Sequence, residues 1–422
     1  MIKVLSLFSG IGAFERAFCR IGLDWELVNY CEIDRWASLS YSMVNQCDES
    51  LNLRDVRTVT AETVRDRQVD LITYGFPCQD ISIAGKQQGF VNDSGESTRS
   101  GLFFEALRII KELRPRYAIA ENVKALTSTK FKNEFATVLS SLEEADYNNY
   151  WRVLNAKDYG IPQNRERVFI VSIRRDVDEG DFQFPEKEPL MLRLRDMLEP
   201  TESVDEKYYR STEREGVRRL IAELEARYSL PAAARIGDTP VICQVGNIVD
   251  NPNRDSQRGR IYDPSGLAPT LNTVGGGGLE AKIVIDGLTR DTQKQKARVF
   301  NPSGLAARIG DTPVLCQIGN IAKDPSREHI QDRIYDPSGL AATLTATDYK
   351  DPLKIAEPEH AYGVRIRKLT PRECWRLMGF LDEEFDRVHG ISNSQLYKQA
   401  GNSIVVNVLS ALLSQLFYKE LV

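Results

Sequence analysis

The sequence has no Cys-X-X-Cys pair and only three histidines, so it offers few ligands for a zinc ion. Its seven cysteines are odd in number and scattered along the chain, which does not fit a disulfide framework. We therefore expect reduced thiols and no metal. The cysteines are Cys19, Cys31, Cys47, Cys78, Cys243, Cys316 and Cys374, and the histidines are His329, His360 and His389.

Long hydrophobic runs are also missing. No apolar stretch approaches the roughly 20 residues of a membrane-spanning helix, and glycines and charges interrupt residues 1–18, so these do not read as a signal peptide. The chain has 422 residues, which suggests two or three domains at roughly 100 to 200 residues each. Its composition excludes a disordered, collagen-like or coiled-coil protein, and we expect a cytoplasmic protein with no membrane partner.

A surplus of positive charge is missing as well. The 55 Lys and Arg residues are outnumbered by 60 Asp and Glu residues, whereas binding to nucleic-acid phosphates needs cationic side chains. The charge is unevenly distributed, because residues 207–350 contain 20 Lys and Arg against 17 Asp and Glu, a net of +3 within a total of −5. A nucleic-acid partner is thus compatible with the sequence if it binds one locally basic face.

Residues 1–175 alternate short apolar runs with amphipathic stretches. Strands separated by helices predict an α/β fold with a doubly wound, mostly parallel sheet that is covered on both faces. In such sheets, ligands bind at the carboxyl ends of the strands. The predicted strands are 3–8, 27–31, 71–75, 117–121 and 168–173, and the predicted helices are 12–22, 35–44, 101–114 and 132–145.

From about residue 184 the composition changes. Residues 186–206 are acidic and contain several prolines, 208–228 read as one charged helix, and 230–355 are dense in Gly, Pro, Asn and Asp. An internal repeat lies in this part: residues 234–274 recur at 307–347, and both copies contain Arg-Ile-Tyr-Asp-Pro-Ser-Gly-Leu-Ala. A partial third copy begins at Arg298. Two long copies are too few for a solenoid, so we expect a duplicated, loop-rich module.

After residue 358 the pattern becomes regular again. Residues 369–378 predict a helix with a capping box from Thr370 to Glu373, and residues 395–416 predict a final apolar helix that is interrupted at 401–403. We expect the two ends of the chain to form one domain, with a smaller domain inserted between them. The expected divisions are 1–185 and 363–422 for the first domain and 186–362 for the inserted one.

The first predicted strand ends at Phe8-Ser-Gly-Ile-Gly12, which is half of a dinucleotide-binding fingerprint because Glu15 stands at the third glycine position. A plain tight turn between a strand and a helix has the same pattern. Glu32, at the end of the second strand, could accept both hydroxyls of a ribose. Asp55 could accept the amino group of an adenine, although a solvated loop aspartate is the alternative. The missing glycine matters less for a ligand without a pyrophosphate, a condition that S-adenosylmethionine (AdoMet) meets and NAD does not.

A second loop, Gly75-Phe-Pro-Cys-Gln-Asp80, follows the strand at 71–75. Pro77 fixes the backbone at the exit of the strand and presents Cys78 at the sheet edge. A lone cysteine is more often a small buried residue, an interpretation that we keep for Cys31 and Cys374. Here, however, polar and glycine-rich sequence continues to residue 101, which is typical of a mobile lid beside an exposed nucleophile.

Two further loops carry ionisable groups toward the same edge. Glu121-Asn-Val123 ends the next apolar strand, and Gln163-Asn-Arg-Glu-Arg167 precedes the strand at 168–173. Taken singly, a glutamate at a strand end is a common cap, and paired arginines are usually solvated. Together with Cys78 they supply a nucleophile, an acid and cations, which a reactive thiol and its electrophile need.

Six motifs resemble, in order along the chain, the signature motifs of the DNA cytosine-5 methyltransferases. The resemblance covers roughly residues 1–175 and 364–412, about half of the chain. The motifs are Leu7-Phe-Ser-Gly-Ile-Gly12, Phe76-Pro-Cys-Gln79, Glu121-Asn-Val123, Gln163-Asn-Arg-Glu-Arg167, Arg367-Lys-Leu-Thr-Pro-Arg-Glu-Cys374 and Gln399-Ala-Gly-Asn-Ser403.

The resemblance implies a Rossmann-like catalytic domain, AdoMet as methyl donor without a metal, a cytosine in double-stranded DNA as acceptor, and a target recognition domain at 186–362. It implies that Cys78 attacks C6 of a flipped-out cytosine, Glu121 binds N3 and the exocyclic amine, and Arg167 contacts O2 with Arg165 in support. The implied donor-site residues are Phe8, Ser9, Gly10, Ile11, Gly12, Glu32, Ile33, Asp55, Pro77, Asn402 and Ser403. The implied substrate or DNA contacts are Gln79, Ser82, Asn122, Gln163, Arg260 and Arg333.

Two alternatives are weaker. A tRNA cytosine-5 methyltransferase of the same fold is disfavoured by the long duplicated region, and a catalytically silent DNA-binding relative is disfavoured by the intact Cys78, Glu121 and Arg167. We expect a monomer; a partner endonuclease, the target sequence and the biological role stay open.

The repeated modules look most like those of bacterial and phage members of the family. Two hypotheses stay open: the copies read two different DNA sequences, as in multispecific relatives, or they are a structural duplication around one recognition site. Arg260, Arg298 and Arg333 occupy equivalent positions, so they would be scaffold rather than discriminating residues. We expect specificity to reside where the copies differ, as at 253–259 against 326–332.

Overall fold

The computed structural model describes residues 1–77, 99–209 and 363–421, together with short pieces of the chain between 211 and 359. The chain forms two compact units. The first combines Met1–Tyr159, Arg165–Glu188 and Met378–Val422, and the second combines Gly160–Asn164 and Pro189–Leu377. The domain limits expected from the sequence stay a prediction. Among the described residues, no helix is long and apolar enough to cross a membrane.

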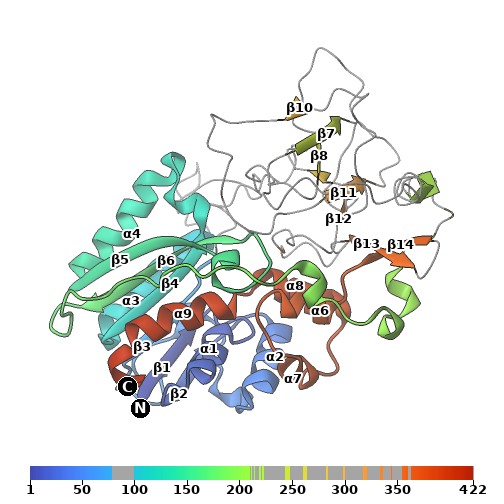
Figure 1. The fold of residues 1–422 in the computed structure, drawn as a ribbon. Coiled ribbons are helices and arrows are strands. Elements are labelled where there is room, and N and C mark those ends of the chain that lie inside the picture. The colour runs from blue at the N-terminus through green and yellow to red at the C-terminus, as the bar shows by residue number, and fades with distance from the viewer. Residues whose placement is uncertain are drawn as a thin grey trace, which may run out of the picture. The chain divides into compact units, whose positions relative to one another are not determined.

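A six-stranded sheet in the order β2-β1-β3-β4-β6-β5 forms the centre of the first unit (Figure 1). The neighbours among β1 to β4 pair in parallel, as expected for a doubly wound fold. Every strand and helix predicted in residues 1–175 is present, with ends that agree within two residues. The strands are β1 (Ile2–Leu7), β2 (Trp25–Cys31), β3 (Leu71–Tyr74), β4 (Tyr117–Val123), β5 (Tyr147–Asn155) and β6 (Glu166–Arg174). The helices are α1 (Ala13–Ile21), α2 (Arg35–Asn45), α3 (Phe103–Leu113) and α4 (Lys132–Glu144).

Helices cover both faces of this sheet. Alternate residues of β1, β3 and β4, such as Leu5, Ile72 and Ala118, pack in one cluster with buried side chains of α3 and α4. The residues between them face the other way and are also buried. On that face the ring of Tyr117 contacts Phe417, the residue after α9 (Val406–Leu416), at 5.2 Å between centroids, and α9 packs against α1. The continuous apolar runs of the parallel strands follow from this double burial.

Strands β5 and β6 differ from the expected pattern. β6 runs antiparallel to β4, and β5 pairs antiparallel with β6 at the edge of the sheet. β5 was not predicted from the sequence, because an edge strand is half exposed and carries polar residues such as Asn148 and Arg152 among its apolar ones. The turn between β5 and β6 therefore lies at the carboxyl end of β4.

Helix α1 begins and ends at glycines in the left-handed conformation, Gly12 (φ 88°) and Gly22 (φ 70°). A Cβ atom on Gly12 would lie 2.1 Å from Nδ2 of Asn45 in α2, so this position needs glycine for its φ angle and for space. The close contact brings α2 next to the start of α1.

The C-terminal helices return to the first unit. The predicted break at 401–403 is confirmed, because α8 (Asn393–Asn402) ends there and α9 begins at Val406. In α8, Gln399 accepts a hydrogen bond from Ser40 and donates one to the carbonyl of Trp36, and Lys398 forms an ion pair of 2.6 Å with Asp34. These bonds fasten α8 to α2. The shorter helices are α7 (Asp382–Asp386) and α10 (Tyr418–Leu421).

In the second unit, the described strands of the two long repeat copies pair in the same way. β7 pairs antiparallel with β8 and β11 with β12, and Gln244 opposite Tyr262 in one copy corresponds to Gln317 opposite Tyr335 in the other. A third strand, β9 or β13, then joins in parallel, and the partial copy contributes β10 beside β7. The strands are β7 (Cys243–Asn247), β8 (Arg260–Asp263), β9 (Lys282–Ile283), β10 (Arg298–Val299), β11 (Gln317–Asn320), β12 (Arg333–Tyr335), β13 (Lys354–Glu359) and β14 (Gly363–Lys368).

The expected helix at 208–228 is wrong at its start. Glu206–Tyr208 is a short 3-10 helix, and Tyr209 forms an isolated bridge with Arg367. Backbone pairing at this point thus replaces the helix that the charged pattern predicted. Four described residues further on, 218, 219, 221 and 222, are helical, and the rest of the predicted helix lies outside the described residues.

The predicted capping box is confirmed in α6 (Pro371–Arg376), where Thr370 and Glu373 bond each other's backbone N–H groups. The Glu373 carboxylate also accepts two hydrogen bonds from the Arg367 guanidinium, at 2.8 and 2.9 Å, and one from the N–H of Glu199. The side chains of Arg367 and Glu373 are both 0% exposed. The motif that contains them therefore has a structural role in the second unit.

We predict that Glu373→Ala lowers the free energy of unfolding by about 3 to 5 kcal/mol, because the buried guanidinium of Arg367 loses its counter-charge. The shift can be measured as a lower denaturation midpoint. As a control, Lys207→Ala removes an ion pair with Asp205 at the surface and should leave the midpoint nearly unchanged. Similar effects of the two substitutions would contradict the role given to Glu373.

Candidate active site

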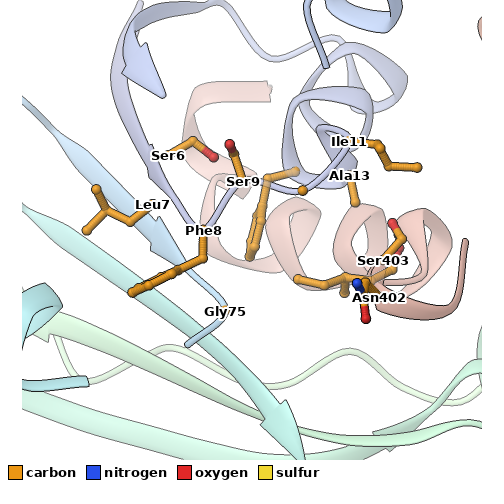
Figure 2. Close-up of a pocket in the computed structure, with 12 residues that line it drawn as sticks. Ser6, Leu7, Phe8, Ser9, Ile11, Ala13, Gly75, Asn402 and Ser403 are labelled. Carbon is orange, nitrogen blue, oxygen red and sulfur yellow. The ribbon is translucent and has the colours of Figure 1, made fainter. Parts of the chain in front are cut away.

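A pocket opens at the carboxyl end of β1, where the chain turns into α1. Phe8 (φ 53°) and Gly10 (φ 57°) are both left-handed, an uncommon conformation for a residue with a side chain. Figure 2 shows Phe8, Ser9 and Ile11 from this loop around the pocket, with Asn402 and Ser403 beside them. The pocket is open to solvent, and about 330 Å³ of free space lies in and in front of it. Its lining is Ser6, Leu7, Phe8, Ser9, Gly10, Ile11, Ala13, Phe14, Gly75, Asn402, Ser403 and Ile404.

The structure thus brings residues 8–11 and 402–403, the first and the last predicted donor-site segments, together in one pocket. Arg165 fixes the C-terminal segment of the pocket, because its Nη2 donates to the carbonyl oxygens of Gly401, at 3.1 Å, and Ser403, at 2.7 Å. The backbone N–H of Arg165 donates to Oδ1 of Asn155 at the end of β5. The guanidinium is buried, and its charge also acts on Glu121. A role for Arg165 in support of Arg167 stays a prediction.

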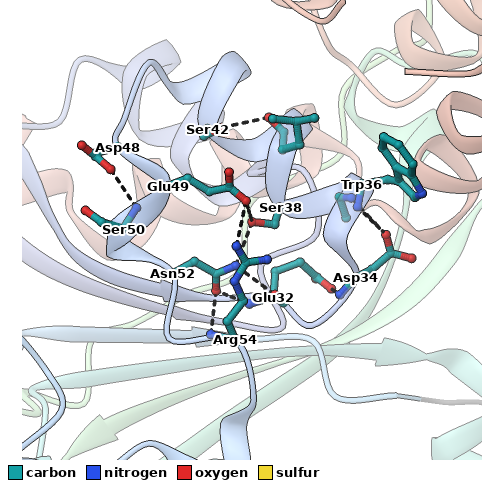
Figure 3. Close-up of polar contacts among 12 residues, drawn as sticks. Glu32, Asp34, Trp36, Ser38, Ser42, Asp48, Glu49, Ser50, Asn52 and Arg54 are labelled. Carbon is teal, nitrogen blue, oxygen red and sulfur yellow. Dashed lines mark hydrogen bonds and ion pairs between the residues drawn. The ribbon is translucent and has the colours of Figure 1, made fainter. Parts of the chain in front are cut away.

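Glu32 follows the last residue of β2 and lies beside Asn52 and Asp34 (Figure 3). Its side chain reaches back to the glycine loop. Its Oε2 accepts a hydrogen bond of 2.9 Å from the N–H of Gly10, and its Oε1 accepts one of 2.7 Å from the N–H of Asp34. Burial raises the pKa of the Glu32 carboxyl, although the two N–H groups and the Lys398 charge oppose the shift. A carboxylate therefore lies against the backbone of the pocket loop.

The other two residues expected at the adenosine end differ in their surroundings. Ile33 is 68% exposed, so an apolar side chain next to Glu32 faces solvent. Asp55 caps a short 3-10 helix and forms a hydrogen-bonded ion pair with Arg57, which holds the pKa of its carboxyl below the usual value. A bond from Asp55 to adenine stays a prediction.

Glu121 and Arg167 form an ion pair at the carboxyl end of β4, with 3.0 Å between Nε and Oε1. Arg167 lies opposite Val123 in the antiparallel pairing of β4 and β6, so it is the diagonal neighbour of Glu121. Burial raises the pKa of the Glu121 carboxyl, and the charges of Arg167 and Arg165 only partly offset this effect. Glu121 therefore holds a proton more readily than an exposed glutamate does.

The pocket and this ion pair are neighbours. Gly75, at the exit of β3, lines the pocket, and Oε2 of Glu121 lies 3.6 Å from the point that a Cβ of Gly75 would occupy. Asn122 is buried and donates to the carbonyl oxygen of Phe76 at 3.0 Å. It therefore holds the chain that leads through Pro77 to Cys78.

The structure describes only some of the remaining predicted site residues. Gln163 is completely buried in the second unit, where its amide bonds the carbonyl of Leu377 and the N–H of Leu344, and a DNA contact for it stays a prediction. Arg260 and Arg333 begin β8 and β12 at equivalent positions. Cys78, Gln79, Ser82 and most of the predicted lid lie outside the described residues. No group of three or more His, Cys, Asp or Glu in the described part of the chain is arranged to hold a metal ion.

Two features of the site were not predicted from the sequence. These are the positions of Gly75 and Ile404 in the pocket lining, and the hydrogen bond of Asn122. A glycine at the exit of a buried strand is a signal for close approach of another group and could have indicated Gly75. The bond from Asn122 to Phe76 joins residues 46 apart, and no local pattern indicates it.

Comparison with known proteins places these features in a family. The family model for C-5 cytosine-specific DNA methylases matches residues 2–418. The orphan methyltransferase M.SPRI of Bacillus phage SPR is 34% identical, over 99% of this chain and 98% of its own length. The type II methyltransferase M.HhaI of Haemophilus parahaemolyticus is 30% identical, over 97% of this chain and 92% of its own.

Solved structures agree on the fold. The Entamoeba histolytica methyltransferase EhMeth superimposes with a TM-score of 0.59 at 14% identity, covering 99% of this chain and 98% of that one. The Dnmt2 methyltransferase of S. pombe gives a TM-score of 0.55 at 17% identity and covers 99% of both chains. The family match over nearly the whole sequence, with the pocket and the ionisable residues beside it, shows that the chain belongs to the C-5 cytosine-specific DNA methylase family.

Proposed function

We propose that the protein transfers a methyl group from AdoMet to C5 of a flipped-out cytosine in a specific double-stranded DNA sequence. The observation that carries the proposal is the position of Gly75, which lines the pocket and faces the Glu121 carboxylate. Since methyl transfer needs donor and acceptor in contact, a donor pocket next to a mostly buried acid is the arrangement that the reaction requires.

The pocket residues fit AdoMet. Gly10 is left-handed and has open space where a Cβ would stand, so its backbone can approach a ligand closely. The Glu32 carboxylate lies at the same loop and can accept bonds from ribose hydroxyls, and the exposed Ile33 can pack on an adenine ring. When bound there, AdoMet supplies an electrophilic methyl group on its sulfonium.

The ring chemistry assigns the other roles. C5 of cytosine is a poor nucleophile, so the Cys78 thiolate adds to C6 and forms a covalent S–C6 bond, which shifts the electrons of the C5–C6 double bond toward C5. Glu121, which holds a proton readily, donates to N3 and withdraws charge from the ring. C5 then takes the methyl group from AdoMet, whose S–CH3 bond breaks to leave S-adenosylhomocysteine. The C5 proton leaves to a base, the thiolate of Cys78 is eliminated to restore the C5–C6 double bond, and N3 returns its proton to Glu121. The arginine of the ion pair, Arg167, is the proposed contact for O2.

Cys78→Ser should reduce methyl transfer to DNA by roughly a thousandfold or more, because a serine hydroxyl is a far weaker nucleophile than a thiolate. Incorporation of labelled methyl groups from AdoMet into mixed DNA and tRNA measures the activity. Cys19→Ser, at an exposed position of α1, is the matched control and should retain full activity. Labelled tRNA beside unlabelled DNA would favour a tRNA methyltransferase, and an active Cys78→Ser protein would refute the nucleophile.

Glu121→Gln should lower kcat by about a hundredfold or more, since an amide cannot donate a proton to N3 with the same driving force. Because the pKa of Glu121 is raised, its protonated form persists above the ordinary range of a glutamate and is lost as pH increases. The rate should therefore fall on the alkaline side of the profile in the wild type, and this limb should vanish in the variant. Glu166→Gln, on the same pair of strands but paired with Lys124, should keep the wild-type profile.

The duplicated modules bear on specificity. The described strands of both copies pair in the same register, which supports two recognition elements over one element with a degenerate copy. Residues 253–259 and 326–332 have equal lengths and different sequences, so one segment can replace the other.

Replacing residues 326–332 with the sequence of 253–259 should abolish methylation of one DNA motif and leave a second one intact, if the copies read separate sequences. Bisulfite sequencing of DNA from cells that express the variant measures the outcome. The reciprocal exchange should abolish the other motif. A single motif that is lost in both variants would instead favour one recognition site with a structural duplication.

A further inference from the structure

We infer that Asn52 is a positioning residue for the donor pocket, which fixes Glu32 at the ribose end and joins it to the turn that carries Asp55. The inference rests on the proposed function, because it assigns Asn52 a part in AdoMet binding. Asn52 lies in the link between β2 and β3, 20 residues after Glu32, and its side chain is buried.

The Asn52 amide makes four hydrogen bonds, which is its full capacity (Figure 3). Its Oδ1 accepts from the N–H of Glu32 at 3.0 Å and from the N–H of Arg54 at 2.8 Å. Its Nδ2 donates to the carbonyl oxygen of Glu32 at 3.0 Å and to Oγ of Ser38 at 2.8 Å. The orientation of the amide is unambiguous, because two backbone N–H groups need an acceptor on one side and a carbonyl needs a donor on the other.

These bonds replace a strand partner that β2 lacks at this point. The pairing of β1 with β2 ends at Cys31, so the N–H and C=O of Glu32 lie beyond the ladder. Asn52 satisfies both, and the parallel bridge between Tyr30 and Asn52 extends the contact by backbone. One side chain thus holds both the N–H and the C=O of Glu32, while the Glu32 carboxylate accepts a hydrogen bond from the N–H of Gly10.

The same amide orders the next turn. Arg54 has a left-handed backbone with φ 63°, and its N–H is bonded to Asn52, while its carbonyl accepts a hydrogen bond from the thiol of Cys31. Asp55 follows directly. One buried side chain therefore sets the relative position of the two carboxylates expected to bind the ribose and the adenine.

Asn52→Asp tests this role, because it keeps the shape and the acceptor but cannot donate to the Glu32 carbonyl and Ser38. The dissociation constant of AdoMet, measured by calorimetry without DNA, should increase roughly tenfold or more. At saturating AdoMet, kcat and the affinity for DNA should stay close to the wild type. Asn133→Asp, the same change at an exposed site in α4, should alter none of these values.

A double-mutant cycle shows whether Asn52 acts through Glu32. In a Glu32→Ala background, Asn52→Asp should weaken AdoMet binding much less than it does in the wild type. Should Asn52→Asp fail to fold, Ser38→Ala removes one of the four bonds and should weaken AdoMet binding by a few-fold.

Unchanged AdoMet affinity in Asn52→Asp, or in Ser38→Ala where the first variant does not fold, would overturn the inference. So would equal losses of AdoMet affinity, DNA affinity and kcat, which indicate general destabilisation. If the wild-type protein itself binds no AdoMet, the proposed function fails instead, so the two failures can be told apart.

Discussion

The antiparallel direction of β6 against β4 brings the ionisable groups of the site together. In a purely parallel sheet, residues that precede a strand lie at the edge opposite to the ligand. Here Arg167 is at the start of β6 and yet lies opposite Val123, at the carboxyl end of β4. The ion pair with Glu121 and the bonds from Arg165 to Gly401 and Ser403 all depend on this reversal. The two arginines at the start of β6 therefore hold both the Glu121 side chain and the C-terminal segment of the pocket.

Two glutamates with raised pKa values, Glu373 and Glu121, differ in the number of their hydrogen-bond partners. Glu373 accepts hydrogen bonds from Arg367, Thr370 and Glu199, and nothing in that set leaves room for a ligand. Glu121 pairs with Arg167 through Oε1, while its Oε2 faces Gly75 at the pocket. Burial raises the pKa of both carboxyls, but of the two only Glu121 has an oxygen that lies beside the pocket, 3.6 Å from the Cβ position of Gly75.

The sequence allowed the parallel half of the sheet to be predicted because β1, β3 and β4 are buried on both faces and read as continuous apolar runs. The capping box at Thr370 was equally local. Pairing direction is not local: the run at β6 indicated a strand but not its reversal, and the polar edge strand β5 gave no clear signal. The role of Asn52 was hidden for the same reason, because its bonds to Glu32 span 20 residues and only the folded chain shows them.

In the second unit, the two long copies of the repeat share some residues and differ in others. Arg260 pairs with Asn247 and Arg333 with Asn320, so the register places both arginines at one equivalent point of the module. Residues that are the same in sequence and in register cannot distinguish one DNA sequence from another, although they can bind a phosphate common to both. On the proposal that each copy reads its own DNA sequence, discrimination comes from the stretches where the copies diverge. The target of one copy then changes by substitutions in one short segment, while the strand pairs stay as they are.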